Sequence, residues 1–208
     1  MMQYIYQGGV VLWVIFAGTA AIFFLFVQRW VHVHRASLRG RDFLSGIFLG
    51  LHRGNILEAA AMCEDTPGPV AQMTRAAILD HQRGGGRTEQ VMQEVGVQAI
   101  TRMERNLPLL LALAQAAPML GLLGTAIGMW EMLDVLNRQA PLLHAGDVGG
   151  GLSLALITTI AGLATGVFGY VAHAFLVNRI SAVVIEMERA YTEVLRVLRE
   201  LPPPEGKG

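Results

Sequence analysis

Residues 116–128 read Ala-Ala-Pro-Met-Leu-Gly-Leu-Leu-Gly-Thr-Ala-Ile-Gly, and they lie inside a stretch without formal charge that covers residues 106–130. A stretch of this length can cross the roughly 30 Å hydrocarbon core of a bilayer as an α-helix. Its glycines allow close packing against other helices, and the hydroxyl of Thr125 is a polar group in a place where polar groups are costly. The segment therefore predicts a membrane-spanning helix that presents one threonine.

The composition of the whole chain indicates a membrane protein. Of its 208 residues, 53% are hydrophobic and only 15% are charged, and the mean hydropathy is +0.45. These values lie outside the usual range of soluble domains. Three uncharged runs, at residues 1–28, 106–130 and 148–178, are each long enough to span a bilayer. We therefore expect an all-α integral membrane protein with three transmembrane helices. The net charge of zero gives no support for a nucleic-acid partner.

The arginines predict the orientation, because flanking segments rich in arginine stay in the cytoplasm. Four arginines lie in the segment directly after the first span and four follow the third, whereas one lies between the second and third spans. They are Arg29, Arg35, Arg39 and Arg41, then Arg179, Arg189, Arg196 and Arg199, and finally Arg138. This distribution predicts a periplasmic N-terminus and a cytoplasmic C-terminus.

Six segments follow from these two patterns. We expect an N-terminal segment and first transmembrane helix over residues 1–28, followed by a cytoplasmic helical region over 29–105. The second transmembrane helix is expected over 106–134, a short periplasmic loop over 135–148 and the third transmembrane helix over 149–178. A cytoplasmic C-terminal helix and tail are expected over 179–208. The first span is interpreted as an anchor and not a cleaved signal, because no positive segment precedes its long apolar core. Cys63 falls in the cytoplasmic region and is assigned to packing.

Helical spacing continues outside the spans. Phe43, Ile47 and Leu51 share one helix face, and breakers follow at residues 66–69 and 84–86. From Thr88 the pattern continues without a breaker to Pro108, which predicts a long helix continuous with the second span. The third span likewise continues at helical spacing past Arg179 until the prolines at 202–204. Both inner spans therefore have expected helical extensions in the cytoplasm.

Small residues form a stripe along each inner span, at steps of three and four. The stripes contain Ala114, Ala117, Gly121, Gly124 and Gly128 in the second span, and Gly151, Ala155, Thr158, Gly162, Thr165, Gly169 and His173 in the third. Such stripes let helix backbones approach closely. Helix packing is therefore the interpretation of Pro118, Gly121, Gly124, Gly128, Ala155, Gly162 and Gly166.

Thr125 and Thr159 each lie 17 residues from Leu142, near the centre of the expected loop. A symmetric antiparallel hairpin would bring their hydroxyls to a similar depth, where the pair could coordinate water or the acid of a partner. The alternative is that each hydroxyl bonds only to the carbonyl four residues earlier in its own helix.

The inner spans contain no Asp, Glu, Lys or Arg at residues 106–130 and 148–178, and a threonine hydroxyl does not titrate at accessible pH. These spans alone cannot relay protons through ionisable groups, so in a proton-driven machine the acid must come from another chain. His173, near the cytoplasmic end of the third span, is a candidate titrating residue, with an interfacial or core role favoured. Glu131 and Asp134 mark the outer interface, with cation access as the alternative.

An enzyme is not expected, and neither is a cofactor. The sequence has no metal-ligand cluster, no phosphate-binding glycine loop and no nucleophile with a nearby base. The glycines at 149–151 are interpreted as the beginning of the third span.

The chain resembles the MotA/TolQ/ExbB proton channel family, and within it the ExbB-like proteins. Residues 117–129 carry the most specific likeness, and residues 104–108, 68–70 and 155–163 support it. The resemblance implies a homo-oligomer, a pentamer, in the bacterial inner membrane around an ExbD/TolR-like single-span partner. It further implies that a membrane aspartate of that partner carries protons along a path lined by Thr125 and Thr159, with Thr158 beside them, and that the motion energises a TonB/TolA-like client.

Two positions depart from the family pattern. Leu154 replaces a glutamate that several members carry five residues before the third-span threonine, and Phe168 replaces a proline. A mechanism that needs this glutamate is therefore excluded. Two other functions remain as alternatives: a non-conducting scaffold that gathers partner helices in the membrane, and a sodium-driven stator of flagellar or gliding type. Flagellar relatives usually have four spans, whereas this chain has three.

Overall fold

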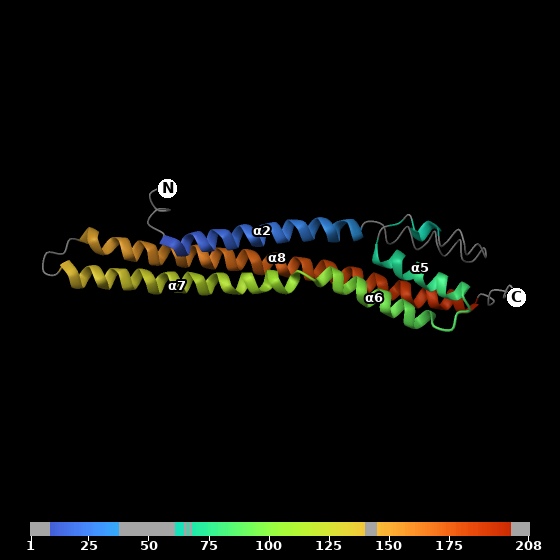
Figure 1. Ribbon diagram of the computed structural model, residues 1–208. Coiled ribbons are helices and arrows are strands. Elements are labelled where there is room, and N and C mark those ends of the chain that lie inside the picture. The colour runs from blue at the N-terminus through green and yellow to red at the C-terminus, as the bar shows by residue number, and fades with distance from the viewer. Residues whose placement is uncertain (1–8, 38–60, 65, 67, 140–144, 201–208) are drawn as a thin grey trace. The chain divides into compact units, whose positions relative to one another are not determined.

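The structure is a computed structural model that describes residues 9–37, 61–64, 66, 68–139 and 145–200, and α-helix is the only regular element within these ranges (Figure 1). The helices are α2 (Gly9–Ser37), α5 (Pro69–Gln82), α6 (Thr88–Glu104), α7 (Leu107–Gln139) and α8 (Ala145–Glu200). The all-α class is thus confirmed. The expected helix face formed by Phe43, Ile47 and Leu51 lies outside the described residues.

Three helical stretches are long and apolar enough to cross a membrane. They are Val10–Val31, Thr88–Arg138 and Gly149–Glu200. Each of the three predicted spans overlaps one of them, which fits an all-α integral membrane protein.

Where the sequence predicts one helix from Thr88 into the second span, the structure has a short interruption. Helix α6 ends at Glu104 and α7 begins at Leu107, with a turn at residues 105–106. The physical reason is Pro108, which has no N–H to donate to the carbonyl of Glu104. In the first turn of α7 the missing N–H is harmless. Helix α8, in contrast, continues past Arg179 to Glu200, as predicted.

The chain divides into two compact units, which are described separately. The first comprises residues 1–28 and 106–175, and its described part contains most of α2, all of α7 and the first part of α8. These three segments lie side by side (Figure 1). Their buried apolar side chains are Leu12, Ile15, Ile22, Leu107, Leu110, Ala114, Ala117, Leu154, Ala155 and Ala172. This core is narrow and rich in alanine, which is typical of membrane helices in close contact.

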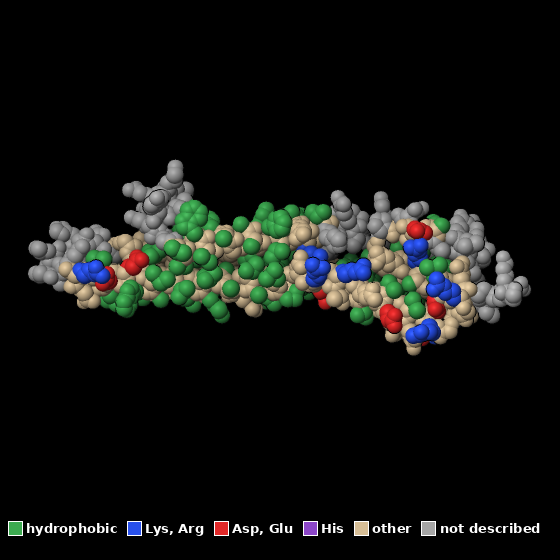
Figure 2. All heavy atoms as spheres, in the orientation of Figure 1, with side chains coloured by type: hydrophobic (Ala, Val, Ile, Leu, Met, Phe, Trp, Pro, Cys, Tyr) green, Lys and Arg blue, Asp and Glu red, His purple; other side chains and the backbone are tan. Residues whose placement is uncertain are grey.

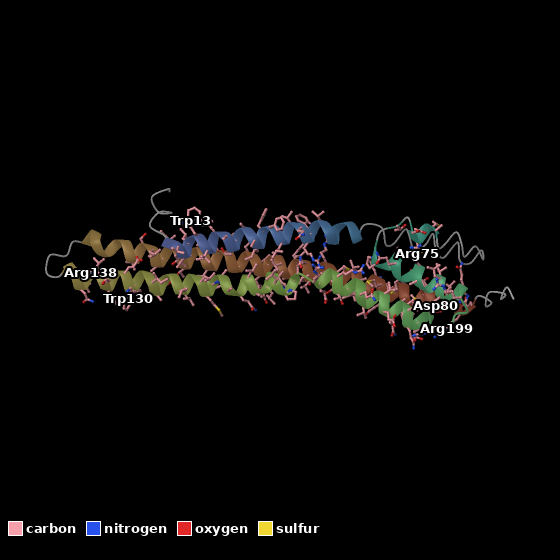
Figure 3. The ribbon with its side chains drawn as sticks, viewed as in Figure 1. Trp13, Arg75, Asp80, Trp130, Arg138 and Arg199 are labelled. Atoms are coloured by element: carbon pink, nitrogen blue, oxygen red, sulfur yellow. The ribbon has the colours of Figure 1, made fainter. Side chains whose placement is uncertain are left out.

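The outside of the first unit is apolar (Figure 2). Trp13 and Trp130 point away from the helices (Figure 3), and their exposed fractions are 65% and 74%. Exposed apolar side chains in such number would be unfavourable in water, but they suit a bilayer. Near the loop end of α7, Asp134 and Arg138 form an ion pair with 2.9 Å between Oδ1 and Nε. Figure 3 labels Arg138 at this end of α7.

The second unit comprises residues 29–105 and 176–208. Its described part contains the end of α2, helices α5 and α6, and the last part of α8. The core contains Cys63, Val70, Met73, Ala77 and Ile78, then Met92, Ala99 and Met103, and, on α8, Val183, Met187, Ala190 and Val194. Charged side chains gather on its surface (Figure 2). One ion pair joins Arg75 and Glu64, with 3.0 Å between nitrogen and oxygen.

Glycine ends α5 in this unit. Gly84 and Gly85 adopt φ values of +120° and +68°, which side chains with a Cβ rarely tolerate. The N–H of Gly85 donates to the carbonyl of Asp80 at 3.0 Å. The Asp80 carboxylate in turn accepts a hydrogen bond from the hydroxyl of Thr88, the first residue of α6, at 2.9 Å. Asp80 therefore stabilises the turn between α5 and α6 through two hydrogen bonds, one to Gly85 and one to Thr88.

Candidate functional site

Thr125 on α7 and Thr159 on α8 form a hydrogen bond through their hydroxyl groups. Both side chains are half-buried in the first unit. Each hydroxyl also has an acceptor in its own helix: Thr125 Oγ1 lies 3.1 Å from the carbonyl oxygen of Gly121, and Thr159 Oγ1 lies 2.9 Å from that of Ala155. The two threonines that the sequence pairs are thus brought together. The bond of each hydroxyl to its own helix, which sequence analysis left as the alternative, is present as well.

The hydrogen-bond count of this pair determines what it can do. Each threonine hydroxyl has one proton, so two protons serve four contacts: one between the threonines, one from each hydroxyl to a carbonyl of its own helix, and one of 3.5 Å from Thr159 to the carbonyl oxygen of Gly121 on the other helix. Either threonine can donate to the other, and the second then donates to its own helix. A small rotation of the hydroxyl groups exchanges these arrangements. The pair can also redirect one proton to an incoming acceptor, such as water or a carboxylate.

Thr158 lies next to this pair in sequence but faces a different neighbour. Its side chain is fully buried, and its hydroxyl donates to the carbonyl of Leu154 at 2.8 Å. It packs against Gly124 so closely that a Cβ at that glycine would lie 2.5 Å from the Cβ and Oγ1 atoms of Thr158. Thr158 therefore belongs to the contact between α7 and α8.

The glycines of the predicted stripes meet across the same contact. A Cβ at Gly128 would lie 2.5 Å from the carbonyl oxygen of Gly151, and a Cβ at Gly162 would lie 2.7 Å from that of Ala117. Other stripe members take part. Gly121 faces Gly162, Ala155 lies against Gly128, and Pro118 lies against Gly166. The backbones of α7 and α8 touch, and this close approach brings Thr125 within reach of Thr159.

Leu154 and Phe168, the two residues that depart from the expected family pattern, both pack within the first unit. Leu154 is buried, with 4% of its surface exposed. Phe168 stacks on Phe23 of α2 with 6.5 Å between ring centroids, and it meets Phe26 edge to face at 6.4 Å. Phe26 also meets Phe175 edge to face at 6.3 Å. A buried apolar side chain thus occupies position 154, and an aromatic cluster joins α2 to α8.

The other candidate residues lie apart from the threonine pair along their helices. His173 is half-buried and follows Thr159 by 14 residues, a separation of about 21 Å along a helix. Glu131 is exposed and lies six residues beyond Thr125, about 9 Å along α7. Neither position allows direct contact with the pair within this chain.

A second threonine pair was missed by sequence analysis. The hydroxyl oxygens of Thr19 on α2 and Thr165 on α8 lie within hydrogen-bond distance of each other. Thr165 appears in the predicted stripe, but Thr19 was not singled out. The available signal is that Thr19 is the only serine or threonine in residues 1–28. A lone hydroxyl in an apolar run needs a partner, either its own helix or a neighbouring one.

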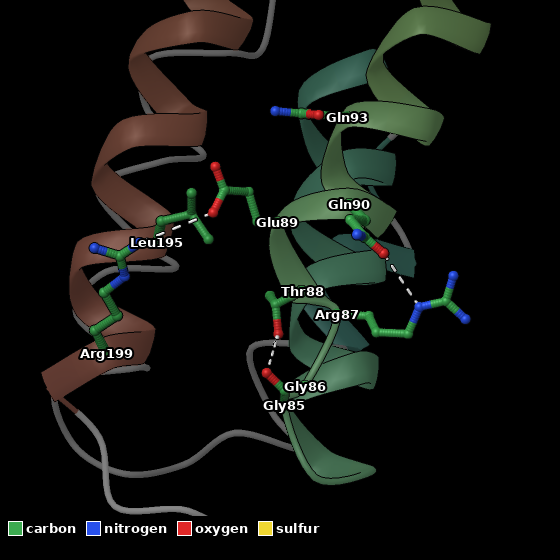
Figure 4. A pocket seen from close by; sticks show the side chains of 9 residues that line it. All are labelled: Gly85, Gly86, Arg87, Thr88, Glu89, Gln90, Gln93, Leu195 and Arg199. Carbon is green, nitrogen blue, oxygen red and sulfur yellow. Dashed lines mark hydrogen bonds and ion pairs between the residues drawn. The ribbon is translucent and has the colours of Figure 1, made fainter.

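The second unit contains a polar cavity of about 430 Å³ at the start of α6 (Figure 4). Its charged groups have partners: Arg199 pairs with Glu89 at 3.9 Å, and Nε of Arg87 donates to Gln90 at 3.2 Å. In the part of the chain that the structure describes, no three His, Cys, Asp or Glu side chains group so as to hold a metal ion. The threonine pair in the first unit therefore remains the candidate site.

Comparison with known proteins identifies the family. Residues 66–189 match the MotA/TolQ/ExbB proton channel family. The chain belongs to this family. This match confirms the resemblance inferred from residues 117–129 and the three supporting segments. Membership of a channel family also fits the apolar helices and places the chain among integral membrane proteins involved in transport.

Two curated relatives support the ExbB-like assignment. The chain is 30% identical over 138 residues to a putative biopolymer transport protein, ExbB homolog, of Methanothermobacter thermautotrophicus; the match covers 66% of this chain and 48% of the relative. It is 33% identical over 112 residues to a putative biopolymer transport protein, ExbB-like 1, of Synechocystis sp.; this match covers 50% of the chain and 44% of the relative. The matches thus span about half the length of each relative.

Proposed function

We propose that this chain is the stator subunit of a proton-driven motor in the bacterial inner membrane. In this proposal Thr125 and Thr159 line the path of an aspartate that a single-span ExbD/TolR-like partner supplies. The chain would form a homo-oligomer, a pentamer, around the partner, with its N-terminus in the periplasm and its C-terminus in the cytoplasm. The motor would act on a TonB/TolA-like client. The observation that carries the proposal is the hydroxyl pair in two spans that contain no Asp, Glu, Lys or Arg at residues 106–130 and 148–178.

The chemistry of the pair suits a carboxylate that changes its protonation state. An ionised carboxylate in a low-dielectric site needs hydrogen-bond donors, and the threonine pair can provide one by releasing a bond to its own helix. A protonated carboxyl group instead needs an acceptor, and a threonine oxygen can accept. Because Leu154 is apolar, no acid from this position would compete for the proton. The partner's acid would then be the single titrating group beside the pair.

Proton uptake by vesicles tests this proposal. The chain is purified together with its single-span partner, reconstituted, and exposed to an imposed pH difference. Thr125→Val keeps the shape of the side chain but removes the hydroxyl, and we expect at least a tenfold slower uptake with the complex still assembled. Thr125→Ser should retain most of the rate. Thr101→Val is a matched control, because Thr101 is exposed and donates only to the carbonyl of Val97, at 2.9 Å.

One observation favours a second function. Leu154 stands at a position where several relatives have a glutamate, so the subunit could serve as a non-conducting scaffold for partner helices. In that case Thr125→Val would leave the energised process at its normal rate. The sodium-driven alternative is separated by replacing sodium with potassium at fixed pH: loss of activity would identify a sodium motor, and unchanged activity a proton motor.

A further inference from the structure

We propose that Arg29, at the end of the first span, is the C-terminal cap of helix α6 and holds the point where that helix ends. In the sequence, Arg29 indicates only the orientation of the first span in the membrane. The proposed cap goes beyond the motor function above, because it would operate whether or not the protein conducts ions.

The contacts of Arg29 are short and directed at one helix end. Its Nη2 atom donates to the carbonyl oxygen of Met103 at 2.6 Å and to that of Arg102. Arg29 lies on α2, and the two acceptors lie 73 and 74 residues later, in the last turn of α6. All three residues belong to the second unit. One guanidinium nitrogen therefore bridges two successive carbonyls of a helix terminus.

These carbonyls are the ones that need a donor. The last four carbonyl groups of an α-helix have no partner within it, and for a helix that ends at Glu104 they include those of Arg102 and Met103. Pro108 prevents the simplest solution, a continuous helix, because it cannot donate to the carbonyl of Glu104. In the described residues the end of α6 has no glycine cap, since Arg105 at that position keeps helical dihedrals. A side chain from another helix supplies the missing donor instead.

The positive charge of Arg29 strengthens the proposed cap. The C-terminus of a helix has partial negative charge, which attracts a cation, and hydrogen bonds from an ionised donor are stronger than neutral ones. A guanidinium group presents several N–H donors in a rigid plane, whereas a lysine ammonium is a flexible point charge. The half-buried position of Arg29 reduces competition from water. An arginine is therefore the residue best suited to this cap.

Hydrogen exchange of the purified full-length protein tests the cap. In Arg29→Gln we expect amides near the end of α6, in peptides covering residues 100–107, to exchange at least about tenfold faster, because charge-assisted bonds have been lost. Amides near the start of α6, at residues 91–96, should be unchanged. Arg35→Gln is the matched control, since it removes the same charge from the same flank of the first span. In Arg35→Gln, amides at residues 100–107 and 91–96 should exchange at the wild-type rate.

Two further variants keep the test decisive. If Arg29→Gln does not insert or fold, Arg29→Lys replaces it, with a smaller increase expected in residues 100–107. Pro108→Ala restores the N–H at position 108, so α6 can continue and pair its own carbonyls; in this background the effect of Arg29→Gln should shrink. Unchanged exchange at residues 100–107 in the Arg29 variants would overturn the proposal. An equal increase in Arg35→Gln would also overturn it, by showing that only the charge of the flank matters.

Discussion

The hydroxyl oxygens of Thr19 and Thr165 lie 2.8 Å apart and join the first span to the third. Thr19 Oγ1 is also 2.8 Å from the carbonyl oxygen of Ile15. Because each hydroxyl has one proton, Thr19 donates to its own helix and Thr165 donates to Thr19. Thr165 is 6% exposed, and this is its one hydrogen-bond partner in the described residues.

We expect Thr19→Val to destabilise the protein by about 1 kcal/mol, because the buried hydroxyl of Thr165 loses its partner. Rotation of Thr165 towards its own helix carbonyl would limit the loss. Thr19→Ser keeps the hydroxyl and should be near wild type. Unfolding in detergent, followed by circular dichroism, measures the difference. Equal stability of the valine and serine variants would contradict the assigned bond.

The close approach at Gly124 leads to a second prediction. Gly124→Ala places a methyl group 2.5 Å from the side chain of Thr158, and we expect a destabilisation of about 1–3 kcal/mol from overpacking. Combining it with Thr158→Ala removes the obstructing Oγ1 and Cγ2 atoms but leaves the Cβ atom, so it should restore only part of the loss. Gly18→Ala on α2 is the matched control, since no atom lies within 4 Å of its added Cβ. Thermal unfolding in detergent gives the comparison, and a Gly124→Ala protein as stable as Gly18→Ala would refute this packing.

A third prediction concerns Cys63, which is buried in the second unit. Burial raises the pKa of its thiol from 9.0 to about 11, although the nearby charge of Arg75 opposes the rise. At pH 8 the thiolate fraction falls roughly 100-fold, and the thiolate is the form that reacts. We therefore expect N-ethylmaleimide to label the folded protein far more slowly than the protein in sodium dodecyl sulfate.

The same pKa determines how Cys63 affects stability with pH. Between pH 9 and about 11 the thiol ionises in the unfolded chain but stays protonated in the folded one. Its contribution to stability is therefore complete below pH 9 and is lost as the pH rises towards 11. Cys63→Ala should unfold with a weaker dependence on alkaline pH. Equal labelling rates of the native and denatured protein would show that the Cys63 thiol is accessible to solvent and that its pKa is not raised.

Much of the fold follows from the sequence, because membrane spans are long and their composition is distinctive. Uncharged length predicted three spans, and the structure has three helical stretches long and apolar enough to cross a membrane; helical spacing also predicted that the third helix continues past Arg179. The pattern did not reveal the interruption between α6 and α7, since Pro108 is tolerated in the first turn of a helix as readily as it ends one. The glycine stripes did predict the helix contact, because close packing of membrane helices depends on small residues.

Only some of the polar contacts could be predicted from the sequence. Thr125 and Thr159 could be paired because the two spans form a hairpin, in which distance from the loop indicates depth. Thr19 and Thr165 are 146 residues apart, and no such rule relates α2 to α8. Arg29 looks like an ordinary positive flank in the sequence, and its acceptors are backbone carbonyls, which every residue has. Contacts of this kind emerge only when the helices are placed together.

The glycine contact between α7 and α8 also has a consequence for water. A water molecule is about 2.8 Å across, yet a single methyl group at Gly124, Gly128 or Gly162 would already collide with the facing helix at 2.5 to 2.7 Å. The seam between these two helices is therefore dry. Because this seam excludes water, a water molecule can approach the half-buried hydroxyl groups of Thr125 and Thr159 only from outside the contact between the two helices.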